Sequence, residues 1–377
     1  MIKYKQDFSL RRVWMFTPEQ YMEMKKKKRQ RWPGKGYFII LFTTIILLVA
    51  LTASLFVILA IDDDDIGEKP QNTGKEPATN TNKSALYPTV PSRSSYLSTS
   101  AGDAALIGDN IRSNNAILVE LGGYTSIAEK GADQPIYPAS MTKVMTLIVA
   151  CENVTSLNKK LVVTQEDIDY KDQNGGSGLL VASSLGDGFT IEDLLYMISY
   201  KSDTIACLMI AKEIAGSEAN FVEMMNDKAD ELGLTKTNFK NCTGLHHTEH
   251  VTTCREMAAM MSYALENQLA KRILLSTDVR KIPAYVGNSN EPLVNYWAHC
   301  EWYSVRFNSE VELNTVTVRA AKTGYTDEAG VCLVSYAVSK TTGKGYVNVI
   351  VGQPKGSGLS ESISTQEVKN IYNAYAK

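Results

Sequence analysis

Residues 137–151, YPASMTKVMTLIVAC, place a serine and a lysine three positions apart at the start of an apolar run. The run from Thr142 to Cys151 predicts a largely buried helix, and residues three apart on a helix share one face. We therefore expect the hydroxyl of Ser140 to lie beside the amine of Lys143. A serine is a weak nucleophile until a base removes its proton. Burial lowers the pKa of a lysine, which would allow it to act as that base.

A second motif, Lys322-Thr323-Gly324, follows the strand candidate Thr315–Ala320. A cation with a hydroxyl neighbour on a strand edge is suited to hold a substrate carboxylate. The glycine would let a substrate backbone come close. A serine-x-x-lysine motif early in the chain and a lysine-threonine-glycine motif late are typical of penicillin-binding proteins and serine β-lactamases.

A third element of this arrangement is expected between the other two, and Ser202-Asp203-Thr204 is the candidate. The hydroxyl of Ser202 would relay a proton between Lys143 and a leaving amine. The usual residue at the third position is asparagine, which offers a donor and an acceptor to a substrate amide. Thr204 has a single hydroxyl and cannot offer the same pair.

From about Ala104 to Gly352 the chain resembles the low-molecular-weight D-alanyl-D-alanine carboxypeptidases, the S11 family of serine peptidases. Several long matches in one order are more specific than any single motif. The matching stretches are 137–143, 190–196, 221–234, 243–246, 250–253, 321–326 and 329–330.

The resemblance implies an acyl-transfer enzyme that needs no cofactor and no metal. Its substrates would be peptidoglycan pentapeptide stems, and β-lactams would inhibit it by acylating the same serine. It assigns Ser140 as the nucleophile, Lys143 as its general base and Ser202 as the proton relay. The residues that it assigns to substrate binding are Thr204, Lys322, Thr323, Gly324 and Tyr325. The backbone N–H groups of Ser140 and Tyr325 would form the oxyanion hole.

Two departures from the family pattern leave other functions open. Thr204 replaces the asparagine, and residues 353–359 hold only Lys355 where the family usually has an arginine-phenylalanine pair. One alternative is a catalytically impaired module of the same fold that binds cell wall or signals. Another alternative is a β-lactamase. The sequence also leaves carboxypeptidase and endopeptidase action undecided.

The N-terminal part of the chain predicts a membrane anchor. Residues 37–61 carry no charge, and a helix of about 25 residues is long enough to cross a bilayer. The basic residues of 25–35 precede this run, which predicts a cytoplasmic tail at 1–36 and an extracytoplasmic location for everything beyond it. The alternative is a cleaved signal peptide, but the apolar run is longer than a usual signal core.

Residues 62–103 are polar and rich in Asp, Asn, Thr, Ser and Pro, which predicts a flexible stalk. Residues 104–377 are expected to form one catalytic domain of the α/β penicillin-binding transpeptidase and β-lactamase-like class. It would have one mainly antiparallel sheet with helices on both faces. The predicted strands are 116–121, 315–320, 331–338 and 346–351. The predicted helices are 142–151, 191–199, 204–215, 221–232, 253–265 and 368–375.

The net charge and the positions of the histidines and cysteines restrict the classes of function and site that the chain can have. The formal net charge of −2 argues against a nucleic-acid binder. His246, His247 and His250 form a cluster that we interpret as a structural loop rather than a zinc site, since zinc needs three or four ligands in a defined geometry. Cys242 and Cys254 flank this loop and would be able to pair outside the cytosol.

Overall fold

The computed structural model describes residues 96–108, 111–286, 289, 291–303, 307, 311–353 and 360–377. The chain divides into two units, residues 1–80 and 81–377, and every described residue belongs to the second. The expected tail at 1–36, the expected membrane span at 37–61 and most of the expected stalk lie outside the described residues. Among the residues that are described, no helix is long and apolar enough to cross a bilayer.

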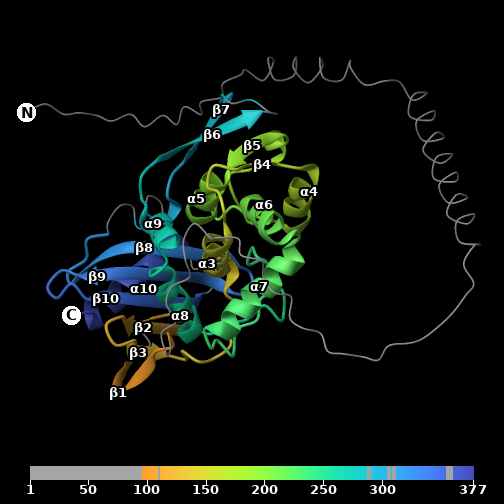
Figure 1. Cartoon of the computed structure of the whole chain (residues 1–377). Coiled ribbons are helices and arrows are strands. Elements are labelled where there is room, and N and C mark those ends of the chain that lie inside the picture. Colours follow the sequence, from red (N-terminus) through yellow and green to blue (C-terminus); the bar gives the residue numbers. More distant parts are fainter. Residues whose placement is uncertain are drawn as a thin grey trace, which may run out of the picture. The chain divides into compact units, whose positions relative to one another are not determined.

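A six-stranded sheet forms one side of the fold, in the order β1-β3-β2-β10-β9-β8 (Figure 1). All neighbours are antiparallel except β1 and β3, which are parallel. Strands β2 and β10 are apolar and buried along most of their length, which explains their central places. The strands of this sheet are β1 (Thr99–Leu106), β2 (Asn115–Glu120), β3 (Thr125–Lys130), β8 (Val316–Thr326), β9 (Gly330–Ser339) and β10 (Gly345–Gln353).

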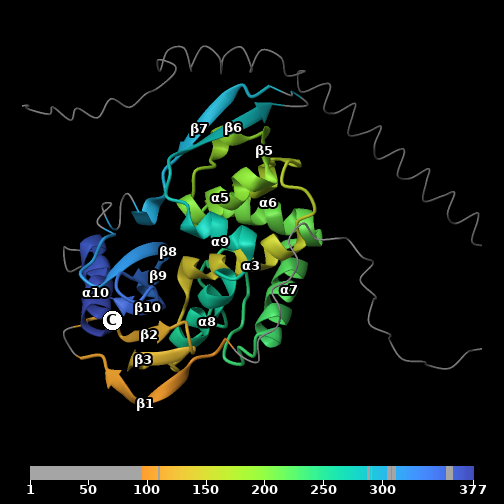
Figure 2. The ribbon, with the colours of Figure 1, turned by 60° about the vertical axis from the view of Figure 1, so that its left-hand side comes forward.

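A second, four-stranded antiparallel sheet corrects the expectation of a single sheet. Its order is β4-β5-β6-β7, with β4 (Lys160–Val162), β5 (Asp187–Thr190), β6 (Arg280–Val286) and β7 (Val294–Ala298). These strands give a weak sequence signal because two of them are very short and β6 contains Pro283, a residue that disfavours strand assignment. Figure 2 shows this sheet beyond the end of α5 and away from the large sheet.

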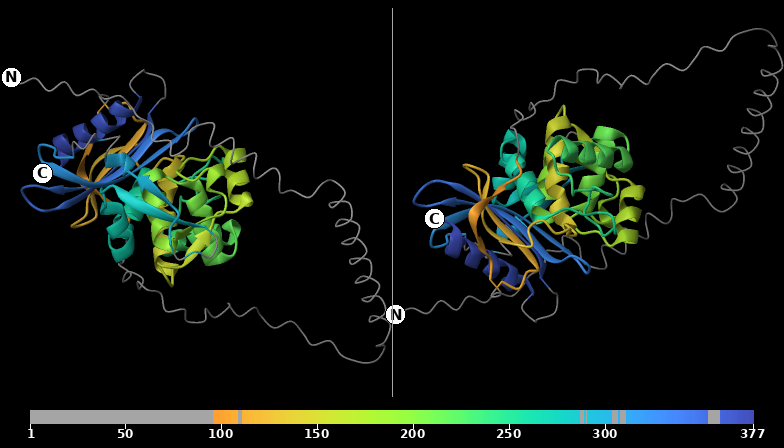
Figure 3. Two further views of the ribbon diagram at one scale, coloured as in Figure 1. Left: turned by 90° about the horizontal axis from the view of Figure 1, so that it is seen from above. Right: turned by 90° about the horizontal axis from the view of Figure 1, so that it is seen from below.

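Helices lie on both faces of the large sheet, as predicted. The C-terminal helix α10 (Ser360–Tyr375) covers one face, and α8 (Cys254–Ala264) with the rest of the helical region covers the other (Figures 2 and 3). The remaining helices are α3 (Lys143–Asn153), α4 (Gln165–Asn174), α5 (Ile191–Lys201), α6 (Thr204–Ala215), α7 (Glu218–Glu231) and α9 (Gln268–Leu275). Two short 3₁₀ turns, η1 (Ala139–Thr142) and η2 (Ala182–Ser184), complete the described elements.

Helix α3 is the centre of the helical region. Every residue of α3 except Asn153 is buried, and it packs against α5, α6, α7, α8 and α9. The neighbouring helices begin and end at residues with clear local signals. The side chain of Thr190 caps α5 by accepting from Asp193 N, and Gly216 ends α6 in the left-handed conformation at φ 78°. The packing of these helices around α3 fixes the position of Lys143, the residue that opens α3.

Candidate active site

Ser140 lies in the 3₁₀ turn η1, directly before α3, and not in the helix itself. The turn starts at Ala139, a non-glycine residue with φ 46°, so the backbone beside the serine is held in a conformation that costs free energy. Lys143 Nζ lies 3.1 Å from Ser140 Oγ. The three-residue spacing therefore brings the two groups together through a tight turn rather than through a regular helix face.

The amine of Lys143 is buried, with only 1% of the residue exposed. Burial lowers its pKa from the ordinary value, and the nearby groups of Cys207, Cys242 and Asp203 oppose that shift. Nζ also donates to the carbonyl of Thr243. A neutral amine in this place keeps that bond and still presents its lone pair to the Ser140 hydroxyl, which is the arrangement that a general base requires.

Ser202 and Lys322 form the second pair of the site. Ser202 ends α5 in the left-handed conformation, at φ 54°, and Lys322 Nζ donates to its Oγ at 3.0 Å. Burial raises the pKa of the Cys207 thiol to about 12, and the charges of Lys143 and Lys322 both oppose that rise. Lys322 lies two residues before Gly324 on β8, and β8 packs against the turn that carries Ser140, so the two pairs lie in the same part of the fold.

Strand β8 forms one wall of the site. It extends beyond the expected end at Ala320, so Lys322, Thr323 and Gly324 lie within the strand and not after it. β8 is the last strand in its sheet, and it packs against η1. A Cβ atom built on Gly324 would lie 3.1 Å from Ser140 N. The absence of a side chain there lets β8 pack directly against the turn that carries Ser140.

A backbone contact on the other side of η1 was not predicted from the sequence. Gly244 has φ +79°, and a Cβ atom there would lie 2.0 Å from the Ala139 carbonyl oxygen and 2.9 Å from Ser140 N. Gly244 therefore lets the loop after Thr243 pack directly against the strained turn. The loop supplies the Thr243 carbonyl to Lys143 and also supports the backbone of Ser140.

The remaining residues predicted to bind substrate, Thr204, Tyr325 and Thr323, each make a hydrogen bond within the protein. Thr204 is 1% exposed, and its Oγ1 accepts from Ser177 N at 3.1 Å. Tyr325 is half-buried, and its hydroxyl donates to Asp327. Thr323 is half-buried, and its carbonyl accepts from Lys322 Nζ at 2.9 Å.

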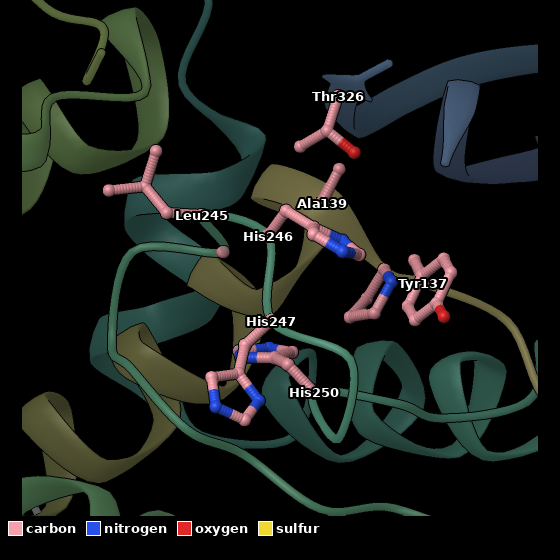
Figure 4. A pocket seen from close by; sticks show the side chains of 9 residues that line it. Tyr137, Ala139, Leu245, His246, His247, His250 and Thr326 are labelled. Carbon is pink, nitrogen blue, oxygen red and sulfur yellow. The ribbon is translucent and has the colours of Figure 1, made fainter. Parts of the chain in front are cut away.

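A pocket beside Ser140 is lined by the histidine loop, residues 244–247 and His250, together with Tyr137–Ala139 and Thr326. Figure 4 shows His246 between Ala139 and Tyr137, and the rings of His246 and Tyr137 meet edge to face with centroids 4.8 Å apart. Within the described residues, no group of three or more His, Cys, Asp or Glu side chains is arranged to hold a metal ion. The thiols of Cys242 and Cys254 are buried and free.

His250 is a buried histidine that holds the turn from behind. Lys240 N donates to its Nδ1 at 3.2 Å, so Nε2 carries the proton and donates to Thr142 Oγ1 at 2.8 Å. Burial, with smaller contributions from the charges of His247, His246 and Lys143, lowers the pKa of His250 to about 3. Protonation of Nδ1 would break the bond from Lys240.

Acidification is therefore expected to destabilise the fold through His250. Its pKa is near 6.5 in the unfolded chain and about 3 in the fold, so the unfolded state binds more protons below pH 6.5 and stability falls as pH decreases through that range. Between pH 7 and pH 5 the loss is roughly 2 kcal/mol. Denaturant unfolding of the wild type and of His250→Gln measures this. Between pH 7 and pH 5, His250→Gln should lose roughly 2 kcal/mol less stability than the wild type. Equal losses in the two proteins would contradict the role given to His250.

The fold agrees with those of solved penicillin-binding enzymes. The crystal structure of the Streptomyces K15 DD-transpeptidase matches 69% of this chain and 94% of that protein with a TM-score of 0.57 at 22% identity. A D-alanyl-D-alanine carboxypeptidase from Mycobacterium tuberculosis H37Rv gives a TM-score of 0.56 at 19% identity, over 72% and 94% of the two chains. The chain therefore has the penicillin-binding and β-lactamase-like α/β fold.

Sequence comparison identifies the family. Residues 100–354 match the profile of peptidase family S11, described as D-alanyl-D-alanine carboxypeptidase, and the chain belongs to this family. The D-alanyl-D-alanine carboxypeptidase DacF of Bacillus subtilis (strain 168) is 30% identical over 223 residues, which cover 59% of this chain and 53% of that protein. The chain thus matches about half the length of this relative. The D-alanyl-D-alanine endopeptidase of Escherichia coli (strain K12) is 26% identical over 67% of this chain and 76% of that protein.

Proposed function

We propose that this chain is a serine-type D-Ala-D-Ala carboxypeptidase that trims peptidoglycan stem peptides through an acyl-enzyme on Ser140. The observation that carries the proposal is the buried amine of Lys143, 3.1 Å from Ser140 Oγ. A lysine with a depressed pKa can accept the proton of a neighbouring serine hydroxyl, and this activates the serine as a nucleophile. Membership of family S11 supports the same chemistry.

The reaction starts when Ser140 Oγ gives its proton to Lys143 Nζ and attacks the carbonyl carbon between the two terminal D-alanines. The backbone N–H groups of Ser140 and Tyr325 stabilise the oxyanion. The C–N bond then breaks, and the departing D-alanine takes the proton through the Ser202 hydroxyl. Water hydrolyses the ester and restores the serine. The 3.0 Å contact between Ser202 Oγ and Lys322 Nζ supports Ser202 in this relay.

Substrate binding uses the outer edge of β8. An exposed strand edge accepts an extended peptide by backbone hydrogen bonds, and Gly324 lets β8 lie close to Ser140. Lys322 and Thr323 hold the terminal carboxylate by charge and hydrogen bonding. β-Lactams enter the same place and acylate the same serine, since their strained amide resembles the scissile bond.

The domain works outside the cytoplasm from an N-terminal anchor. Residues 37–61 form the single membrane span, with residues 1–36 in the cytoplasm, and the chain between residue 62 and the start of β1 at Thr99 connects the span to the catalytic domain. A flexible chain of about 40 residues has a root-mean-square reach of roughly 35 Å. That reach lets the domain meet stem peptides at some distance from the bilayer.

Release of D-alanine from diacetyl-L-Lys-D-Ala-D-Ala tests the proposed function. The wild type is expected to release one D-alanine per peptide with turnover, and folded Ser140→Ala is expected to release none. A cross-linked muropeptide dimer in a parallel assay separates endopeptidase from carboxypeptidase action. Penicillin labelling without any release would contradict the proposal in favour of an impaired binding module, and fast hydrolysis of a chromogenic β-lactam would favour a β-lactamase.

A further inference from the structure

The segment Gly176–Leu180, called the docking segment below, lies directly on the turn that carries Ser202. Three hydrogen bonds join Ser177 to this turn. Thr204 Oγ1 accepts from Ser177 N at 3.1 Å, Thr204 N donates to Ser177 O at 3.0 Å, and Ser177 Oγ donates to the carbonyl of Ser202 at 2.9 Å. Every polar group of Ser177 is therefore bonded to the turn.

Asp203 attaches the other end of the docking segment. It is fully buried, and its Oδ2 accepts from the backbone N–H groups of Leu179 and Leu180, the latter at 2.8 Å. Its Oδ1 caps α6 by accepting from Ala206 N at 3.0 Å. One carboxylate thus ties the segment to the start of α6, the helix that Thr204 opens.

Two glycines of the docking segment pack closely against the side chains of Thr204 and Asp203. A Cβ atom on Gly176 would lie 2.7 Å from Thr204 Oγ1, and one on Gly178, at φ +125°, would lie 2.4 Å from the Asp203 carboxyl carbon. The segment and the turn are in contact without spare room. A side chain longer than threonine at position 204 would have to displace the segment or turn away from it.

We propose that Thr204 is a positioning residue, whose hydroxyl fixes the docking segment and, through Ser177, holds Ser202 in its left-handed conformation with Oγ directed to Lys322. The inference rests on the proposed function, since it concerns the relay serine. It differs from the substrate-amide contact that the family resemblance implies for position 204. In this chain the Thr204 hydroxyl has a backbone partner, and its effect reaches the reaction through Ser202.

Three substitutions of Thr204 separate the two roles. Thr204→Val keeps the shape but removes the acceptor of Ser177 N, Thr204→Ser keeps the acceptor, and Thr204→Asn restores the usual family residue. Stopped-flow acylation by a fluorescent penicillin over a range of concentrations resolves the binding constant from the acylation rate constant. We expect Thr204→Val to reduce the rate constant roughly 10- to 100-fold, as for a misplaced catalytic group, with little change in binding. Thr204→Ser should retain most of the rate, and Thr204→Asn should be slower than the wild type.

Ser177→Ala supplies the matched control, because it removes only the bond to the Ser202 carbonyl. If Ser177 and Thr204 act on Ser202 together, the acylation rate constant of the double variant Ser177→Ala/Thr204→Val falls by less than the product of the two single fold-reductions. Acylation by Thr204→Val at the wild-type rate would overturn the proposal. So would Thr204→Asn acylating as fast as the wild type or faster.

Hydrogen exchange of the docking segment tests the positioning role of Thr204 without relying on the proposed function. Faster exchange at the Ser177 amide in Thr204→Val, with Thr204→Ser close to the wild type, supports the positioning role whatever the enzyme's substrate. Unchanged exchange at that amide in Thr204→Val overturns it. Failure of the proposed function would appear elsewhere, as a folded wild-type protein that penicillin does not acylate at Ser140.

Discussion

Lys143→Met is expected to reduce acylation of Ser140 by penicillin roughly 10²- to 10⁴-fold, the usual contribution of a general base. Methionine has a similar length and no charge, so it suits a site where Lys143 is 1% exposed. The fold should therefore persist while the proton acceptor 3.1 Å from Ser140 Oγ is lost. Acylation rates by fluorescent penicillin, with circular dichroism as the control for folding, measure the effect.

The pH dependence of acylation identifies the same group. Burial lowers the pKa of Lys143, so the amine is neutral and active at lower pH than an ordinary lysine. The wild-type rate is expected to rise with pH through this depressed pKa and to fall on acidification, as Nζ becomes protonated. Lys143→Met should lack that limb. A folded variant that acylates at the wild-type rate, or that keeps the same limb, would show that another group is the base.

Gly244→Ala is expected to abolish acylation and to destabilise the fold by roughly 3 kcal/mol, the upper range for forced overpacking. Its Cβ atom would lie 2.0 Å from the Ala139 carbonyl oxygen and 2.9 Å from Ser140 N. The neighbouring atoms belong to the backbone and cannot rotate away. Thermal unfolding and penicillin labelling report the two effects.

Gly343→Ala is the matched control for this substitution. Gly343 has φ +70°, close to that of Gly244, but a Cβ atom there has nothing within 4 Å. Its substitution should cost about 1 kcal/mol, from the left-handed conformation alone, and leave acylation intact. Similar behaviour of the two variants would mean that the fit between Gly244 and η1 does not matter.

Helices with strong local signals were predictable from the sequence. Helix α6 begins at Thr204 and ends at Ala215, as predicted, because Asp203 caps its start and Gly216 stops it. Strand β1 was not predicted, and it begins at Thr99, ahead of the expected domain start at Ala104. Its sequence, TSAGDAAL, is polar and small. Only pairing with β3 makes it a strand, and pairing is a tertiary effect.

The site was predictable where two residues are close in sequence or belong to a known motif. The proximity of Ser140 and Lys143 follows from their spacing. The contributions of the Thr243 carbonyl, Gly244 and Ser177 were not predictable, because they come from backbone atoms and from loops that meet only in the fold. The glycine-rich stretch 175–178 was a usable signal, since closely spaced glycines often mark a close backbone approach.

Intact-mass spectrometry after incubation with benzylpenicillin, followed by peptide mapping, tests the central claim most directly. The account predicts one penicilloyl adduct per chain, located on the peptide that contains Ser140, and no adduct on folded Ser140→Ala. An adduct on a different residue, or an unmodified wild-type protein that is folded, would contradict it.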